Sequence, residues 1–173
     1  MRQSARWLSV LLALSSVARA VQFPTLQCDT LSGKHLTMPA AAQGNPALFI
    51  VGFTANASEQ TNYWTKHIPK DLVTTYSIAV LENTRRLLRP MKLNELSTAV
   101  KRDKKNYTTD KLDRFLVIYS NEKELKEAVG FEAPDEAYLV LIAPDGSVQW
   151  RFHGAFTHTA LKDLRDHLHA VRQ

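Results

Sequence analysis

The sequence contains almost no cysteine. Cys28 is the only one among 173 residues, so the chain cannot form an internal disulfide bond. A zinc site that needs two or more thiolate ligands is excluded for the same reason. Any function that depends on a pair of thiols within one chain is therefore excluded as well.

Other features are scarce too. Six glycines and seven prolines are too few for a low-complexity or fibrous chain, and the sequence has neither an internal repeat nor a Gly/Ser linker. After residue 20 no apolar run is long enough to span a bilayer. Neither G-x-x-x-x-G-K-[ST] nor G-x-G-x-x-G occurs, so no motif supports nucleotide binding. What remains, with 45% hydrophobic and 23% charged residues, is the composition of one globular domain.

Residues 1–20 have the layout of a secretory signal peptide. Two arginines precede a short apolar run from Trp7 to Leu14, and Ala18-Arg19-Ala20 is an A-x-A cleavage site. A mitochondrial presequence is the alternative, because Arg and Ser are frequent and the first acidic residue is Asp29. We expect a signal peptide at 1–20 and one domain at 21–173, which is secreted or periplasmic or, in the alternative, mitochondrial.

The basic character of the whole chain comes largely from that leader. The formal net charge is +5, and residues 1–20 hold three arginines and no acidic residue. Without them, 19 basic and 17 acidic side chains leave a net charge of +2. Nucleic-acid-binding proteins usually carry a concentrated basic footprint, so we do not expect a nucleic-acid partner.

The hydrophobic pattern alternates between strands and helices. Short apolar runs predict buried strands, and the continuous run at 48–53 is typical of a strand buried on both faces. The predicted strands are 48–53, 75–81, 115–119 and 138–142, with a half-buried strand at 148–152, and the predicted helices begin near residues 56, 91, 121 and 157. This alternation predicts a mainly parallel α/β sheet with helices on both faces and a closing β-hairpin.

Local signals predict where several of these elements begin and end. Asn56 and Asn121 each stand three residues before a glutamate, a pattern typical of a helix N-cap. Gly130 is expected to end the helix that Asn121 begins. Thr157 or Thr159 is expected to begin the last helix, whose apolar residues recur at helical spacing.

This order of elements resembles the thioredoxin-like superfamily, in its peroxiredoxin and thiol-disulfide oxidoreductase branch. The similarity covers nearly all of residues 23–171. It is carried by the opening FPTLQCDTLSGKHL, the strand and loop LFIVGFTANAS, the segment DRFLVIYSNEKELKEAVGF and the hairpin YLVLIAPDGSVQW. The resemblance implies a thioredoxin-like α/β fold with a C-terminal β-hairpin and flanking helices.

A narrower resemblance concerns the C-terminal hairpin. Residues 137–142, followed by 148–155 with a Trp-x-x-x-Gly pattern, are similar to the C-terminal segment of the mitochondrial ATP synthase assembly factor family. Members of that family are thioredoxin-like chaperones that need no redox pair. This similarity therefore implies a role in assembly rather than in electron transfer.

The expected site of redox chemistry holds no sulfur. In this fold the nucleophile lies where the first buried strand ends and a helix begins, because unpaired N–H groups and the helix dipole stabilise a thiolate there. Compared with the C-x-x-C pattern, Ser58 and Thr61 stand at the cysteine positions; compared with the peroxiredoxin pattern, Ala57 or Ser58 stands at the reactive one. Hydroxyl groups form no disulfide, so we interpret these residues as a vestigial redox loop.

Cys28 leaves two interpretations open. It lies in an extended lead-in (residues 23–34) with no Lys, Arg or His beside it in sequence. This favours a small, buried, unreactive side chain. The alternative is a divergent thiol oxidoreductase or one-Cys peroxidase that uses this thiol.

Other candidate binding residues come from the same resemblance. The family carries a cis-proline before the terminal hairpin, and Ala137 occupies that position here. A cis bond at a non-proline residue costs about 2.5–4 kcal/mol, so we expect a trans bond at Ala137, with Pro134 as a displaced substitute. Trp64 and Trp150 are candidates for a groove, although both also fit the core.

Residues 84–114 are locally basic. They hold ten Lys/Arg and four acidic residues, with one group at Arg85, Arg86 and Arg89 and a second at 101–105. This excess predicts an anionic surface as partner, such as lipid headgroups or an acidic protein face. A solvated helix and loop is the simpler interpretation.

No metal or cofactor is expected. The six histidines lack the spacing of metal ligands, and a hydrolase triad on Ser58 would lack the G-x-S-x-G turn. Glycosylation sequons begin at Asn56 and Asn106 and matter only in a eukaryotic secretory pathway. The sequence thus predicts an exported, redox-inactive thioredoxin-like protein that acts by protein binding or assembly assistance.

Overall fold

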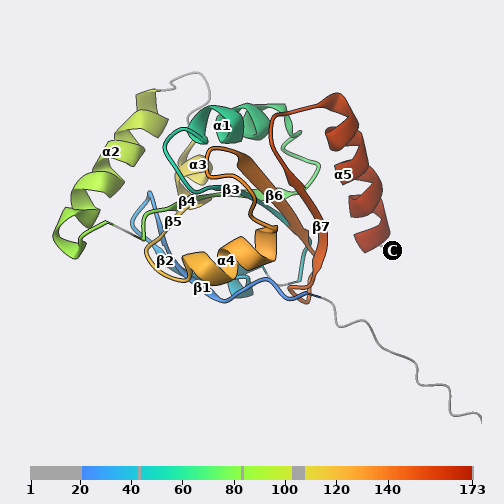
Figure 1. Ribbon diagram of the computed structural model, residues 1–173, viewed down its shortest axis with the longest axis horizontal. Coiled ribbons are helices and arrows are strands. Elements are labelled where there is room, and N and C mark those ends of the chain that lie inside the picture. Colours follow the sequence, from blue (N-terminus) through green and yellow to red (C-terminus); the bar gives the residue numbers. More distant parts are fainter. Residues whose placement is uncertain (1–20, 43, 83, 103–107, 173) are drawn as a thin grey trace, which may run out of the picture.

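A seven-stranded sheet forms the centre of the protein, and helices lie against both of its faces (Figure 1). The computed structural model describes residues 21–42, 44–82, 84–102 and 108–172. The expected leader, part of the second basic group and Asn106 lie outside these residues. The strand order is β2-β1-β5-β4-β3-β6-β7.

The elements alternate along the chain much as the hydrophobic pattern predicts. The strands are β1 (Leu26–Thr30), β2 (His35–Met38), β3 (Ala47–Gly52), β4 (Thr74–Val80), β5 (Phe115–Ile118), β6 (Ala137–Ile142) and β7 (Val148–His153). The helices are α1 (Ser58–His67), α2 (Arg89–Arg102), α3 (Thr109–Asp113), α4 (Glu122–Val129) and α5 (His158–Val171), with short 3-10 turns η1 (Ala40–Ala42) and η2 (Arg86–Leu88).

The sheet is mixed. β3 pairs in parallel with β4, and β4 pairs in parallel with β5, whereas the other four pairings are antiparallel. Parallel pairing is limited to these three central strands because a hairpin closes each end of the sheet. The C-terminal hairpin was expected. The lead-in instead turns back at Gly33, with φ +89°, and forms the hairpin β1-β2.

Apolar side chains fill both faces of the sheet. The whole run Ala47–Val51 is buried, which confirms the expected strand covered on both sides. Phe49 belongs to the cluster that α4 covers. Ile50, next in the chain, belongs to the cluster around Trp64 of α1 and the apolar stripe of α5. Neighbouring residues of β3 therefore pack into two separate hydrophobic clusters, one on each face of the sheet.

The expected helix ends are partly confirmed. The Thr157 hydroxyl accepts a hydrogen bond from the backbone N–H three residues on at 3.1 Å, and Gly130 ends α4 with φ +70°. Asn121 stands at the N-cap of α4 as expected, but its side chain makes no capping bond. The Glu82 carboxylate accepts from the N–H of Glu122 instead, at 3.1 Å.

Helix α2 lies at one edge of the molecule (Figure 1). It begins at Arg89, slightly earlier than expected, and Leu93, Leu96 and Val100 pack against a small cluster over β5. Among the described residues, no helix combines the length and the apolar character needed to cross a membrane.

Candidate functional site

Helix α1 begins directly after β3, at the edge of the sheet where the sequence places the vestigial redox loop. Ala57 stands at the N-cap and is fully buried, and no side chain caps the helix. The expected capping role of Asn56 is wrong, because its amide donates to the Asp135 carboxylate at 3.3 Å instead. The N–H of Ala57 donates to the Thr54 hydroxyl at 3.4 Å.

The two hydroxyl residues of the loop are oriented by the helix itself. Ser58 is exposed, whereas Thr61 is half-buried and donates its hydroxyl hydrogen to the backbone carbonyl of Ser58 at 3.1 Å. Neither side chain can undergo thiol-disulfide exchange, which requires a sulfur nucleophile.

Cys28 lies far from α1 in the architecture. It sits on β1 within the cluster that α4 covers, whereas α1 packs on the opposite face of the sheet. Its side chain is only 2% exposed, and the thiol donates to the Leu26 carbonyl at 3.8 Å. Burial, and secondarily the negative charge of Asp29, raises the pKa of the Cys28 thiol to about 12. The reactive thiolate is therefore strongly disfavoured at neutral pH.

Asp135 joins the two loops that border the start of α1. Its carboxylate accepts from the hydroxyl of Thr54 at 2.7 Å and from the side-chain amide of Asn56 at 3.3 Å. These two donors hold the pKa of Asp135 below its usual value. The loop after β3 is thus tied to the loop before β6.

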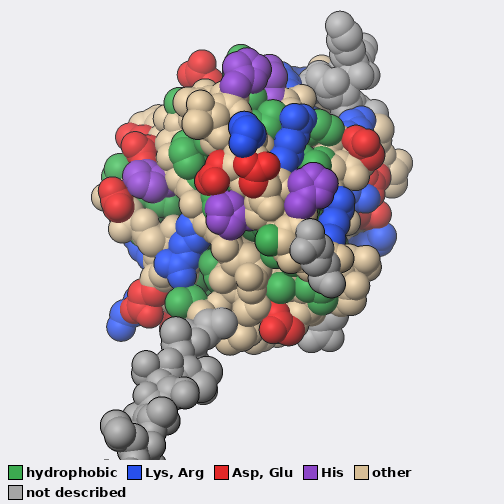
Figure 2. Space-filling view, turned by 90° about the vertical axis from the view of Figure 1, so that its right-hand side faces the viewer, with side chains coloured by type: hydrophobic (Ala, Val, Ile, Leu, Met, Phe, Trp, Pro, Cys, Tyr) green, Lys and Arg blue, Asp and Glu red, His purple; other side chains and the backbone are tan. Residues whose placement is uncertain are grey.

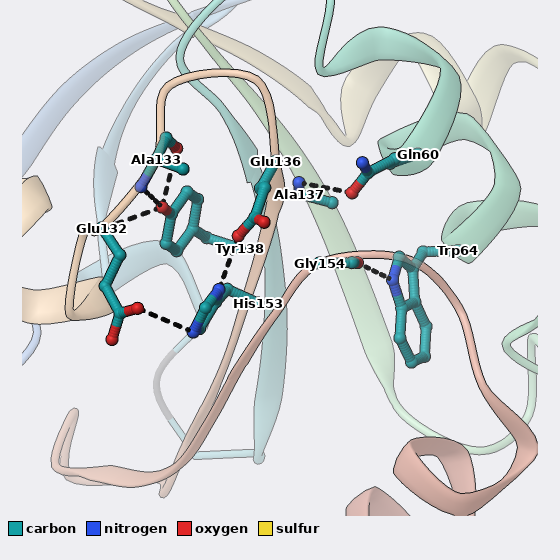
Figure 3. Close-up of polar contacts among 9 residues, drawn as sticks. All are labelled: Gln60, Trp64, Glu132, Ala133, Glu136, Ala137, Tyr138, His153 and Gly154. Carbon is teal, nitrogen blue, oxygen red and sulfur yellow. Dashed lines mark hydrogen bonds and ion pairs between the residues drawn. The ribbon is translucent and has the colours of Figure 1, made fainter.

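Ala137, at the position of the expected cis-proline, has both backbone groups paired within the protein, and Figure 3 shows the bond of its N–H to Gln60. Its N–H donates to the Gln60 side-chain oxygen at 3.2 Å, and its carbonyl accepts from the N–H of Gly154 at 2.9 Å. Within the described residues the cis peptide bond is Met38–Pro39, so the bond before Ala137 is trans as expected. The bond before Pro134 is also trans, so Pro134 is no displaced cis-proline.

Both tryptophan candidates belong to the core. Trp64 is fully buried and donates its indole N–H to the carbonyl of Gly154 at 2.9 Å (Figure 3). Trp150 is 6% exposed and donates to the carboxylate of Asp163 at 2.7 Å. Trp64, Trp150 and the buried Ala137 present no side-chain surface to a partner in this conformation.

A polar cluster beside Ala137 was missed by the sequence analysis (Figure 3). The Tyr138 hydroxyl accepts from the N–H groups of Glu132 and Ala133 at 2.9 and 2.8 Å and donates to the carbonyl of Ala133 at 2.7 Å. His153 lies between two carboxylates, 2.6 Å from Glu136 and 3.6 Å from Glu132. These contacts hold the loop before β6. No local pattern predicts them, because the partners come from two strands and a loop.

The histidines form no metal site. On the face of the molecule toward α5 they are scattered among other side chains rather than gathered (Figure 2). Within the part of the chain that the structure describes, no group of three potential metal ligands converges on one point. His35 and His153 each have one close carboxylate neighbour, Asp29 at 2.5 Å and Glu136 at 2.6 Å.

A cavity of about 680 Å³ lies beside the start of α1, between α1 and α2. It exists because the residues on the sheet beneath it are small, with Gly52 on β3 and Ser77 and Ala79 on β4. The partly buried Phe53 and Leu96 contribute apolar walls. Its volume lies within the range of about 300–1,000 Å³ that is common for ligand sites.

The first basic group lies at and just before the start of α2, and its side chains differ in exposure. Arg85 and Arg86 are exposed. The Arg89 guanidinium lies over the Tyr119 ring, 4.3 Å from its centre, and its Nε is buried without a hydrogen-bond partner among the described residues. Arg89 therefore attaches the start of α2 to the body of the protein.

Comparison with known proteins supports the architecture. No protein-family model matches the chain, and no curated protein matches its sequence. The chain is similar to the solved structure of BsSco, of the Sco family of cytochrome c oxidase assembly proteins, with a TM-score of 0.59 and 12% identity over 88% of this chain and 94% of that one. It is similar to the exposed lipoprotein thioredoxin Etrx1 of Streptococcus pneumoniae, with a TM-score of 0.55 and 11% identity over 83% of this chain and 98% of that one. It is also similar to a thio-disulfide isomerase of Thermus thermophilus, with a TM-score of 0.51 and 16% identity over 86% of this chain and 94% of that one.

The fold is thioredoxin-like. The predicted fold class is thereby confirmed, and the similarity at these low identities concerns the fold alone. BsSco is described as having a disulfide switch, which requires two cysteines, whereas this chain has Cys28 alone. The narrower resemblance to ATP synthase assembly factors stays a prediction.

Proposed function

We propose that this thioredoxin-like protein acts by non-covalent protein binding, in assembly or a related task, and performs no thiol chemistry. The observation that carries the proposal is the position of its only thiol. Cys28 is buried on the face of the sheet opposite α1, so no sulfur is available at the start of α1 where this fold concentrates its reactivity. The chain therefore has the fold of a thiol oxidoreductase without a thiol at the position where that fold uses one.

The closed loops around α1 support the same proposal. Asp135 is bonded to Thr54 and Asn56, and the backbone of Ala137 is bonded to Gln60 and Gly154. A substrate peptide that paired with Ala137 would have to displace these bonds. Recognition at this edge therefore needs a surface other than the backbone of Ala137.

The cavity beside Ser58 is the surface that we propose for the partner. Partly buried apolar side chains, Phe53 and Leu96, line it, and lysines at positions 66 and 92 stand at its border. An apolar side chain of a partner protein would remove these groups from water, at about 25 cal/mol for each Å² of apolar surface buried. Acidic residues next to that side chain would meet Lys66, since Lys92 is already paired with Glu95 at the same border.

We further propose that the protein works after export. The leader at 1–20 has the n-region, apolar run and cleavage site of a signal peptide. The similar pneumococcal thioredoxin is described as an exposed lipoprotein, which is compatible with this fold acting outside the cytoplasm. N-terminal sequencing of the protein purified from its native source should begin at Val21; a native chain that retains Met1 would contradict export by cleavage.

The absence of thiol chemistry is tested by insulin reduction and peroxide consumption. The native protein should show background rates, equal to those of Cys28→Ser. The double variant Ser58→Cys/Thr61→Cys supplies C-x-x-C at the start of α1 and is the positive control, because it should gain insulin reductase activity. Turnover by the native protein that Cys28→Ser abolishes would instead establish the alternative, a divergent thiol oxidoreductase or one-Cys peroxidase that uses Cys28.

Thiol accessibility gives a second measurement. Iodoacetamide should leave Cys28 unmodified in the native protein at neutral pH and modify it fully in urea, because burial holds its pKa at about 12. Rapid modification of the folded protein would contradict the proposal.

The position of the partner surface is tested by site-specific photo-crosslinking in the native compartment. Asn62 borders the cavity and is exposed, and Lys123 is exposed on α4 across the sheet. A crosslinker at position 62 should trap a defined protein, and the same crosslinker at position 123 should not. Equal adducts at both positions would place the contact elsewhere.

A further inference from the structure

The start of α2 exposes apolar side chains in an unusual way. We call residues 85–92 the α2 tip. Five large apolar side chains are exposed among the described residues, and three belong to this tip: Leu87 at 93%, Leu88 at 44% and Met91 at 60%. Single exposed leucines are ordinary on a protein surface. Three within five residues of chain form a patch, and exposed patches of this kind mark interaction sites.

Basic side chains surround these apolar ones. Arg85 and Arg86 are exposed, and no hydrogen bond or ion pair joins either guanidinium group to a residue that the structure describes. Lys92 forms an ion pair with Glu95 at 2.8 Å. Glu95 is the one acidic residue at 84–102. The tip therefore combines apolar side chains with an unneutralised positive charge.

The tip protrudes rather than forming a groove. It consists of the single turn η2 and the beginning of α2, at the left edge of the molecule in Figure 1. In the described part of α2 the buried residue is Ser97, so the tip is held mainly by Arg89 on the Tyr119 ring. Eight residues cannot supply the 800 Å² or so that each side of a stable protein interface buries.

We propose that the α2 tip binds the surface of an anionic phospholipid bilayer. Leu87, Leu88 and Met91 enter the boundary between headgroups and acyl chains, where their exposed surface leaves water. Arg85 and Arg86 remain at the level of the phosphates, to which guanidinium groups donate charge-assisted hydrogen bonds. The association is peripheral and reversible, and its apolar and arginine contacts lie outside the proposed partner surface at the cavity, which shares only Lys92 with the tip.

Vesicle flotation tests this proposal. Residues 21–173 contain every strand and helix of the fold, and this form keeps the leader out of the bilayer. The protein should bind vesicles of phosphatidylglycerol mixed with phosphatidylcholine, and it should bind less as salt screens the arginines. Equal binding to pure phosphatidylcholine, no binding to either, or salt-independent binding would each overturn the proposal.

Paired variants separate the two contributions. Leu87→Ser/Leu88→Ser should weaken binding to the anionic vesicles at least about tenfold, given the free energy of burying a leucine side chain. Arg85→Ser/Arg86→Ser should weaken it about fivefold for each charge. Lys70→Ser/Lys123→Ser removes the same charge from other exposed positions and should have little effect. If this control pair weakens binding as much as the arginine pair, general charge and not the tip is responsible.

A probe at the tip distinguishes a bilayer from an acidic protein. Cys28 is buried, so an environment-sensitive fluorophore on Leu87→Cys labels position 87 alone. Its emission should shift to the blue on anionic vesicles and stay unchanged with polyglutamate. A shift with polyglutamate and none with vesicles would overturn the proposal in favour of an acidic protein face.

Discussion

The start of α1 and the α2 tip differ in whether their polar and apolar groups contact the rest of the protein or remain exposed to water. At the start of α1, polar groups are bonded to one another, as in the contacts of Asp135 and of Gln60 with Ala137. At the α2 tip, Leu87 is almost fully exposed and the Arg85 guanidinium has no partner among the described residues. The loop and backbone groups where this fold normally performs its chemistry are paired within the protein, whereas a peripheral helix start leaves apolar and basic side chains in water.

The difference has a physical cause. Hydrogen bonds within the protein replace those that backbone groups would form with water or a ligand, so the bonded loop groups at the start of α1 gain little from a partner. Exposed apolar side chains gain free energy whenever they leave water. We therefore expect substitutions of the bonded or buried groups around α1 to change stability, whereas substitutions at the tip should change binding to the bilayer.

The largest loss of stability is expected for Trp64→Ala. The side chain is fully buried in the cluster between α1, β6 and α5, and its N–H is bonded to Gly154. Removing a buried tryptophan should cost about 3–5 kcal/mol of unfolding free energy, measured by urea unfolding. Trp64→Phe, which keeps part of the ring, should lose less. A loss below that of Trp64→Phe would contradict the packing described here.

A smaller loss is expected for Tyr138→Phe. The hydroxyl of Tyr138 satisfies two backbone N–H groups and one carbonyl of the loop before β6. Leaving buried groups unpaired should cost about 1–3 kcal/mol. Tyr119→Phe is the matched control, because the buried Tyr119 hydroxyl has no partner among the described residues. That change should be neutral or slightly stabilising, and equal losses in both variants would refute the role given to Tyr138.

A pH-dependent effect is expected for Asp135→Asn. Hydrogen bonds from Thr54 and Asn56 hold the pKa of Asp135 below its usual 3.8. The carboxylate therefore contributes stability above that pH, and the contribution is lost as pH falls through the lower folded pKa. Asp135→Asn should lower the Tm slightly at neutral pH, and the difference from the native protein should shrink in acid. Asp71→Asn, at an exposed position, is the control; a difference that persists unchanged in acid would argue against the Asp135 contacts.

The smallest effect on stability is expected for Leu87→Ala. Because Leu87 is 93% exposed, its truncation should change the free energy of unfolding by no more than about 0.5 kcal/mol. The same variant should bind anionic vesicles more weakly than the native protein. A clear loss of stability would show that the tip packs against the body, and the contrast between the two regions would then fail.

Much of the fold could be predicted from the sequence because buried strands and amphipathic helices have distinct periods. The run around Phe49 predicts a central strand, and Gly130 and Thr157 predict helix ends, all of which the structure confirms. β2 was missed because it is short and its burial is partial. The Asn56 cap failed because Ala57, one residue later, stands at the N-cap, and the Asn56 amide donates to Asp135, which is distant in sequence.

The sequence predicted which residue types occupy the candidate site, but not the contacts that those residues make. The presence of Ser58 and Thr61 in place of cysteines is visible in the sequence. The bond between Gln60 and Ala137 is not, because it joins a helix and a strand 77 residues apart. The exposure of Leu87 is equally hidden, since leucine next to leucine usually indicates core.

The amino-acid sequence alone determined how many thiols this protein has and the periodicity that builds its strands and helices, because both are properties of the chain itself. Only the tertiary structure decided that Cys28 faces α4 rather than α1, that the loops at α1 bond to each other, and that Leu87 stays in water. Those outcomes depend on strand pairing and on which face of the sheet each residue meets, and both are set by contacts between segments far apart in sequence.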